Sequence, residues 1–253
     1  MARLFHRFDG PEKAPVLVLS NSLGTALEMW DPQMPALTGR FRVLRYDTRG
    51  HGRSDVPPGA YTIAELGKDV LALLDETGVE RASFCGLSMG GMIGMWLGTN
   101  APGRIERLVL CNTSAQMIGT PELWQQRITL ARTRGMTALA EGVIERWFTP
   151  EFRARDPEAV EKVRKMLLAT PGEGYAACCA AIRDQDQLDS ISAVRAPTLV
   201  IAGSRDPATP PDHGRAIASR IRGARFVELP AAHLSNIEAR DRFNASLSEF
   251  LAA

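Results

Sequence analysis

Residues 84–94 read Phe84-Cys85-Gly86-Leu87-Ser88-Met89-Gly90-Gly91-Met92-Ile93-Gly94, and they contain the pattern G-x-S-x-G between an apolar run and a segment rich in small residues. This pattern is typical of a sharp turn from a strand into a helix, with the serine presented at the carboxyl end of a sheet. Gly86 and Gly90 fit a turn that leaves hardly any room for side chains. Ser88 is therefore the candidate nucleophile, but so short a motif depends on its context.

The context is an alternation of strand and helix signals. The run at residues 15–20 is near-continuously apolar, which is typical of a strand buried on both faces, and further strands are predicted at residues 41–46, 81–85, 105–111, 198–202 and 225–229. Thr62-Ile63-Ala64-Glu65 has the spacing of a capping box and predicts a helix that ends before Gly78. Short connections in this order predict right-handed crossovers and an α/β fold, with a mostly parallel central sheet and helices on both faces.

The alternation stops after Cys111, and only helical signals follow as far as Asp189. Thr120-Pro121 and Asp156-Pro157 each combine a capping residue with a proline at the first helical position. We therefore predict a core made of residues 1–111 and 190–253, with an all-helical cap, residues 112–189, inserted after the strand that ends near Cys111.

Composition limits the classes of partner. The chain has 253 residues with 45% hydrophobic content, which suits one globular domain with an insertion. Lys+Arg 30 against Asp+Glu 29 leave a charge of +1, so neither a nucleic acid nor an anionic membrane is an expected partner. No secretory signal and no membrane-spanning apolar stretch is recognised, and a cytoplasmic protein is expected. The sequence leaves the oligomeric state open.

The four cysteines, at positions 85, 111, 178 and 179, have neither metal-site nor disulfide-framework spacing. Cys85 and Cys111 lie in apolar runs and are interpreted as small buried hydrophobic residues. No metal site is expected.

A serine hydroxyl needs a base to take its proton and a third group to orient that base. His233 follows the last predicted strand, in a loop that faces the Ser88 turn if the strands are parallel. Asp206 follows the strand at residues 198–202. The chain order serine, acid, histidine, each after a different parallel strand, makes His233 the candidate base and Asp206 the candidate acid.

Other candidates have simpler structural interpretations. His51 precedes the serine in a glycine-rich loop, and His213 lies in the first turn of a helix as an exposed polar residue. Asp47 and Asp55 are expected to brace turns, and Asp212 to cap a helix.

Attack on a carbonyl also needs donors for the oxyanion. The backbone N–H of Met89, the residue after the nucleophile, is one candidate. The second is the backbone N–H of Leu23, in the loop after the strand that ends at Ser20. The Leu23 side chain is expected to line the pocket.

Together these residues resemble the α/β-hydrolase superfamily, through Gly86–Gly90, the loop Asp47-Thr48-Arg49-Gly50-His51-Gly52-Arg53-Ser54, and the placement of Asp206 and His233. Within it, Leu19-Ser20-Asn21-Ser22-Leu23-Gly24-Thr25 with Met29-Trp30, and Glu145-Arg146-Trp147-Phe148-Thr149-Pro150, look like the 3-oxoadipate enol-lactonases over nearly the whole chain. Many members of the superfamily carry a His-Gly pair where this chain has Asn21-Ser22, and that departure is part of the enol-lactonase likeness.

The resemblance implies an α/β-hydrolase fold and a serine hydrolase that opens 3-oxoadipate enol-lactone to 3-oxoadipate. It implies a place in bacterial degradation of aromatic compounds through catechol or protocatechuate, the β-ketoadipate pathway. Ser88 would form an acyl-serine, with His233 as base and Asp206 holding the imidazole. Neither a metal nor an organic cofactor is expected.

The implied small-molecule lactone carries a carboxylate, which favours a cation in an otherwise apolar pocket. The cap offers Arg127, Arg132 and Arg134. Trp124 and Arg127 are three residues apart on one helix face and are the candidate substrate-binding pair. The alternative is that Trp124 packs within the cap and the arginines are solvated. Trp147 is expected in the cap core.

Other functions fit the same residues. A carboxylesterase, a hydrolase of carbon–carbon bonds in vinylogous diketones, or a cofactor-free perhydrolase would use the same three catalytic side chains. A non-catalytic ligand-binding protein of this fold is a different class, which retention of Ser88, Asp206 and His233 disfavours.

Overall fold

A computed structural model describes residues 1–252, and within them seven strands form one sheet. β1 pairs antiparallel with β3, and every other neighbouring pair is parallel. The strands in spatial order are β1 (His6–Asp9), β3 (Arg42–Tyr46), β2 (Val16–Ser20), β4 (Ala82–Leu87), β5 (Ile105–Cys111), β6 (Thr198–Gly203) and β7 (Arg225–Leu229). This arrangement confirms the predicted α/β class with a mostly parallel sheet.

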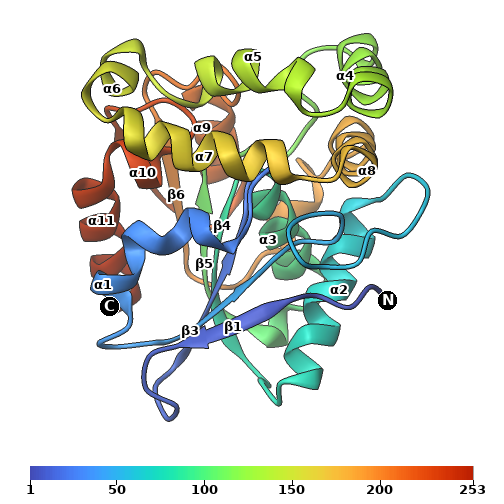
Figure 1. Cartoon of the computed structure of the whole chain (residues 1–253). Coiled ribbons are helices and arrows are strands. Elements are labelled where there is room, and N and C mark those ends of the chain that lie inside the picture. The colour runs from blue at the N-terminus through green and yellow to red at the C-terminus, as the bar shows by residue number, and fades with distance from the viewer. Residues whose placement is uncertain (253) are drawn as a thin grey trace.

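Strands β4 and β6 are buried along their whole length, which is typical of central strands in a parallel sheet covered on both faces. The helices are η1 (Leu27–Gln33), α1 (Met34–Leu37), α2 (Ile63–Glu76), α3 (Met89–Asn100), η2 (Pro102–Arg104), α4 (Pro121–Arg134), α5 (Thr137–Trp147), α6 (Pro150–Arg155), α7 (Pro157–Ala169), α8 (Gly172–Arg183), η3 (Ser190–Ala193), α9 (Pro211–Arg220), α10 (Ser235–Glu238) and α11 (Arg240–Ala252). Figure 1 shows α1 and α11 on one face of the sheet and α2 and α3 on the other.

Helix α2 begins as the sequence predicts. The Thr62 hydroxyl accepts a hydrogen bond from the backbone N–H of Glu65 (3.1 Å), and the Glu65 carboxylate accepts one from the backbone N–H of Thr62 (2.9 Å). Both bonds of the capping box are present, so two backbone donors at the start of α2 are satisfied. Its apolar face includes Leu66 and Val70 and is buried.

In the chain, helices α4 to α8 come between β5 and β6, and Figure 1 shows α4 to α7 at the top of the view, above one end of the strands. This segment contacts loops of the core: the backbone N–H of Leu234 donates to the carbonyl of Trp147 (3.1 Å). A Cβ atom on Gly174, in α8, would lie 2.1 Å from the carbonyl oxygen of Gly50. The N-terminal turn of α8 therefore packs directly on the glycine-rich loop. The treatment of residues 112–189 as a separate cap stays a prediction.

Two helical segments are irregular. Residues 27–37 form a 3₁₀ segment, η1, followed by one turn of α-helix, and Pro32 lies inside η1. The last helical segment is interrupted at Ala239, whose φ and ψ are −114° and 39°. There the Glu238 carboxylate turns back to accept the backbone N–H of Ala232 (3.0 Å).

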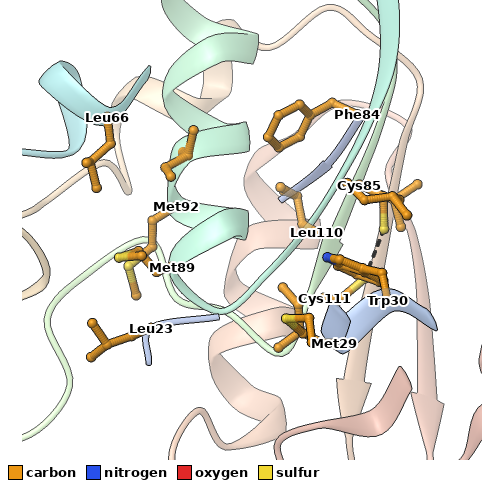
Figure 2. Packing of buried hydrophobic residues seen from close by; sticks show 14 of the residues in the cluster. Leu23, Met29, Trp30, Leu66, Phe84, Cys85, Met89, Met92, Leu110 and Cys111 are labelled. Carbon is orange, nitrogen blue, oxygen red and sulfur yellow. Dashed lines mark hydrogen bonds between the residues drawn. The ribbon is translucent and has the colours of Figure 1, made fainter. Parts of the chain in front are cut away.

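A continuous apolar core surrounds β4 and the start of α3 (Figure 2). Leu23, Met89 and Phe84 all belong to it. Cys85 and Cys111 are fully buried with their sulfur atoms 3.9 Å apart, which agrees with their interpretation as core residues. None of the helices in residues 1–252 has the length and apolarity to cross a membrane.

Candidate active site

Ser88 lies at the turn between β4 and α3 with φ 56° and ψ −115°, a backbone conformation that residues with a Cβ rarely adopt. The turn is as tight as its glycines predict. A Cβ on Gly86 would lie 2.1 Å from the carbonyl oxygen of Gly90, and one on Gly90 would lie 2.3 Å from that of Ser20. The Ser88 backbone N–H donates to the carbonyl of Cys111 (2.8 Å), which fixes the turn to β5.

Asp206 and His233 are brought together as predicted, from the loops after β6 and β7. The Nδ1 atom of His233 lies 2.8 Å from Oδ2 of Asp206, and both residues are 3% exposed. An N–H on Nδ1 that donates to the carboxylate leaves Nε2 free to accept a proton. The pair has the orientation that a general base and its supporting acid require.

The Asp206 carboxylate accepts several hydrogen bonds. Its Oδ1 accepts the backbone N–H groups of Ala208 (2.8 Å) and Thr209 (2.9 Å). Its Oδ2 accepts the Thr209 hydroxyl (2.6 Å) and the side-chain amide of Asn112 (3.0 Å), besides His233. Burial raises the pKa of Asp206, but the charge and hydrogen bond of His233 and the bonds from Thr209 and Asn112 outweigh it, so the pKa is lowered overall. Asp206 is therefore ionised at neutral pH.

Ser88 is 8% exposed and is also the residue from which α3 departs. Within residues 1–252, its hydroxyl makes no hydrogen bond to His233. Such contacts are often long without a substrate and shorten when one binds. The carboxylate–imidazole pair is thus formed without a ligand, and the serine–imidazole contact is not.

Each of the two candidate oxyanion donors lies beside a residue whose backbone N–H makes a hydrogen bond. Neither the Leu23 N–H nor the Met89 N–H is used in a hydrogen bond within the described part of the chain. Their neighbours are used: the Gly24 N–H donates to Nε2 of His51 (2.8 Å), and the Gly90 N–H donates to the carbonyl of Asn21 (3.0 Å). Two unengaged donors beside two fixed ones are suitable for binding an oxyanion.

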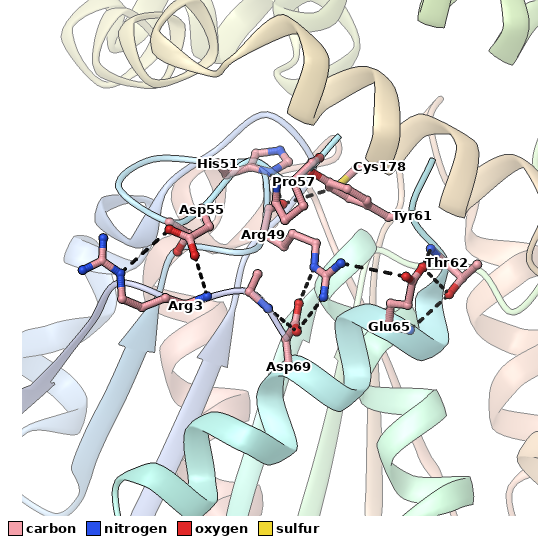
Figure 3. A network of polar contacts seen from close by, with 12 residues as sticks. Arg3, Arg49, His51, Asp55, Pro57, Tyr61, Thr62, Glu65, Asp69 and Cys178 are labelled. Carbon is pink, nitrogen blue, oxygen red and sulfur yellow. Dashed lines mark hydrogen bonds and ion pairs between the residues drawn. The ribbon is translucent and has the colours of Figure 1, made fainter. Parts of the chain in front are cut away.

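His51 holds the loop of Leu23. Its Nδ1 lies 3.2 Å from the carbonyl of Arg49, so a neutral ring protonated on Nδ1 satisfies both contacts. Burial lowers the pKa of His51 to about 4, which keeps the ring neutral. Figure 3 shows the neighbouring Arg49, whose guanidinium pairs with Asp69 through two hydrogen bonds (2.5 and 2.7 Å). Arg49 and His51 therefore brace their loop.

The rival candidates have structural roles. Asp47 accepts the backbone N–H groups of Leu27 and Arg53 and thereby braces its turn. The expectation that Asp212 caps a helix is wrong, because the position before α9 is Pro210 and Asp212 pairs with Arg215 instead. His213 is partly buried, with Nδ1 2.9 Å from the hydroxyl of Ser114.

On the cap side, Trp124 and Arg127 lie together on α4. The Arg127 guanidinium is 5.3 Å from the ring centroid of Trp124 and 5.2 Å from that of Tyr175, on α8. The Nε atom of Arg127 is buried and has no hydrogen-bond partner among residues 1–252. Arg132, by contrast, pairs with Glu173 at the surface. Of these two arginines, Arg127 is the one with a buried donor left for a ligand.

Tyr175 connects this arginine to the loop of Leu23. A Cβ on Gly24 would lie 3.1 Å from Cε2 of Tyr175, so the ring packs against that loop. The Tyr175 hydroxyl is buried, and it too has no hydrogen-bond partner in the described chain. Arg146 adds a second cation: desolvation and the positive charge of Arg127 lower its pKa. Trp147 is buried, as expected for the cap core.

Sequence reasoning missed Asn112, Thr209, Tyr175 and Arg146. Asn112 follows the carboxyl end of β5, and a polar residue at that position of a parallel strand is a usable signal. Tyr175 and Arg146 carry no such signal, because their contacts with Arg127 join three different helices.

The comparisons with known proteins agree with this geometry. The family model of the alpha/beta hydrolase fold matches residues 15–240. The chain belongs to the α/β-hydrolase family. The 3-oxoadipate enol-lactonase 2 of Acinetobacter baylyi is 42% identical over 93% of this chain and 88% of its own.

Solved structures of other α/β-hydrolases superpose closely. An enol-lactonase from Burkholderia xenovorans LB400 has a TM-score of 0.98 and 49% identity, over 100% of this chain and 97% of that one. A thermophilic esterase from Thermogutta terrifontis, with malate bound, has a TM-score of 0.93 and 30% identity, over 99% and 93%. The predicted resemblance to the enol-lactonases and the expected enzyme class, a hydrolase, are confirmed.

Proposed function

We propose that this α/β-hydrolase opens 3-oxoadipate enol-lactone to 3-oxoadipate through an acyl-serine, in the bacterial β-ketoadipate pathway. The observation that carries the proposal is the buried, unpartnered Nε of Arg127 between two aromatic rings, one of which packs on the loop of Leu23. A carboxylate-bearing lactone is a substrate that needs both a serine nucleophile and such a cation.

The acylation step uses Ser88 and His233. The Ser88 oxygen forms a bond to the lactone carbonyl carbon while its proton passes to Nε2 of His233, and Asp206 stabilises the resulting imidazolium. The carbonyl oxygen becomes an oxyanion that accepts the N–H groups of Leu23 and Met89. Its collapse breaks the ring carbon–oxygen bond and releases an enolate, which takes up the proton held on Nε2 of His233 and becomes a ketone, so that His233 is neutral again.

Deacylation repeats the chemistry with water. Neutral His233 takes a proton from water, whose oxygen attacks the acyl carbon, and collapse of the second tetrahedral intermediate breaks the bond to Ser88. The serine oxygen recovers its proton from His233, and 3-oxoadipate leaves with a new carboxylate. An enolate leaves more readily than a simple alkoxide, so protonation of the leaving group is less demanding than it is in amide cleavage.

The substrate's own carboxylate is assigned to Arg127. A guanidinium held over Trp124 and Tyr175 keeps its plane fixed, and a carboxylate would satisfy the buried Nε. The buried hydroxyl of Tyr175 could donate to the same anion. Trp124 would form one wall of the apolar pocket, with its Nε1 already donating to the carbonyl of Ile118 (2.8 Å).

A carboxylesterase is the second candidate. The likeness to the Thermogutta terrifontis esterase favours it, since Ser88, His233 and Asp206 alone would suffice for a neutral ester. The two candidates differ in their use of Arg127.

The test is to incubate the purified protein with the enol-lactone and to follow the loss of the lactone absorbance and the appearance of 3-oxoadipate by NMR. Rapid quenching followed by mass spectrometry of the peptide that contains Ser88 would detect the acyl group. Conversion of the lactone with an adduct on that peptide is the expected result. Conversion with the adduct on another residue would refute the acyl-serine, and absence of conversion would refute the substrate.

A further inference from the structure

Asn112 follows β5 directly and joins three parts of the site. It is 1% exposed, and its backbone N–H donates to the carbonyl of Ile201 in β6 (2.8 Å). Its φ is 43°, in the left-handed region, where asparagine is among the residues best tolerated. The burial and the backbone conformation of Asn112 together restrict the direction of its side chain.

The polar atoms of the Asn112 side chain are engaged. Its Nδ2 donates to Oδ2 of Asp206 (3.0 Å) and to the carbonyl of Ala232 (3.2 Å), the residue before His233. Its Oδ1 accepts the hydroxyl of Ser235 (2.5 Å), at the start of α10. The amide has this orientation because only its N–H₂ end can face a carboxylate.

The end of β6 closes around the same contacts. A Cβ on Gly203 would lie 2.3 Å from the carbonyl oxygen of Ala232 and 3.0 Å from Nδ2 of Asn112. The strand that leads to Asp206 and the loop that carries His233 therefore meet at Asn112, without space for a side chain between them.

We propose that Asn112 is a positioning residue for the reaction: its amide sets the acid loop against the base loop, so that Asp206 holds His233 in the productive orientation. The proposal rests on the proposed roles of Ser88, Asp206 and His233. The other side-chain donors to Oδ2 come from Thr209, three residues from Asp206, and from His233 itself. Asn112 is the donor that reaches from a different strand and also binds the backbone beside the base.

Removing this amide should change catalysis more than binding. Asn112 is buried with its side chain engaged, so it has no free group for a substrate. The charged and titratable groups around the contact are Asp206 and His233, with Glu238 on α10 accepting the backbone N–H of Ala232 (3.0 Å). A new carboxylate at position 112 would stand beside Asp206 and favour the protonated form of His233.

The experiment compares two variants with wild type on the enol-lactone and on a neutral aryl ester, over a range of pH. Asn112→Gly accepts the left-handed backbone but lacks the amide, and Asn112→Asp keeps the shape but replaces the donor by a charge. Asn100→Gly is the matched control, because Asn100 is exposed at the end of α3, where its amide donates to the carbonyl of Trp96. The folded fraction of each protein is measured by circular dichroism at the assay temperature.

Asn112→Gly should lower kcat per folded molecule about 10- to 100-fold on both substrates, with KM changed less than about twofold. Asn112→Asp should lower kcat further and move the acidic limb of kcat/KM to higher pH by about one unit. Asn100→Gly should behave as wild type.

The proposal is overturned if both Asn112 variants keep the wild-type kcat and pH profile per folded molecule, or if their losses follow the folded fraction alone. Ser88→Ala, assayed in parallel, separates this outcome from a failure of the proposed chemistry. Wild-type turnover by Ser88→Ala would reject the nucleophile, whereas an inactive Ser88→Ala beside fully active Asn112 variants would reject only the role of Asn112.

Discussion

The two sides of the site differ in how completely their polar atoms are satisfied. Around Asp206 and His233, both carboxylate oxygens have donors, and the supporting Asn112 is itself held by Ser235. On the cap side, the Nε of Arg127 and the hydroxyl of Tyr175 are buried without partners in the described chain. Unsatisfied buried donors are costly, so the pair of Asp206 and His233 is complete without a ligand, whereas the cap side keeps buried polar atoms that a ligand could satisfy.

The largest expected effect comes from the catalytic side. Ser88→Ala should lower kcat about 10⁴-fold or more on the lactone and on a neutral ester alike, because the nucleophile is common to both reactions. Ser114→Ala is the matched control: Ser114 is also a buried serine in contact with a histidine, His213, but its hydroxyl donates to the carbonyl of Gln116. Steady-state kinetics would contradict the assignment if the Ser114 variant, rather than the Ser88 variant, lost activity.

The next largest effect concerns His51, which holds the Leu23 loop, and it is measured as a change in the free energy of unfolding. Burial lowers the pKa of His51 to about 4 from 6.5. At pH values between these two, His51 is protonated in the unfolded chain and neutral in the folded chain. Stability should therefore fall as the pH is lowered from about 6.5 to about 4, by up to about 3 kcal/mol from this residue.

Urea unfolding at pH 7.5 and 5 measures this loss. His51→Gln cannot take up the proton, so the wild type should lose about 2 kcal/mol more than the variant between the two pH values. Equal losses in both proteins would show that His51 is not kept neutral by burial.

Replacing Arg127, on the cap side, should have a smaller effect, and this effect should differ between an anionic and a neutral substrate. Arg127→Met should raise KM for the anionic lactone about 30-fold, because a charge-assisted bond is lost, and should leave a neutral aryl ester within about twofold. Arg132→Met is the control on the same helix, since Arg132 pairs with Glu173 at the surface. An equal rise in KM for both substrates would assign Arg127 to the packing of the cap.

The smallest effect is expected at Arg146, which is near enough to Arg127 for that positive charge to lower its pKa. Arg146→Gln should raise KM for the lactone about threefold at low salt, and the effect should shrink as salt screens the more exposed charge. Initial rates at two ionic strengths measure it. A salt-independent rise as large as that of Arg127→Met would place the carboxylate on Arg146 instead.

Local patterns predicted those features whose cause is local. The capping box of Thr62 and Glu65 and the continuous apolar runs of β4 and β6 led directly to a helix and to buried strands. The order of Ser88, Asp206 and His233 could be read because each follows a parallel strand. The contact of Glu238 with Ala232, beside the break at Ala239, could not be read from the sequence, and the contacts of Asn112 and Tyr175 join segments far apart in the chain.

The most direct test of the central claim is the ratio of kcat/KM for 3-oxoadipate enol-lactone to kcat/KM for a short-chain aryl ester, measured with the purified wild-type protein. If the cap side is completed by the lactone carboxylate, the ratio should be at least about 10², and Arg127→Met should reduce it about 30-fold. A ratio near or below one, unchanged in Arg127→Met, would contradict the enol-lactonase assignment and favour a general carboxylesterase.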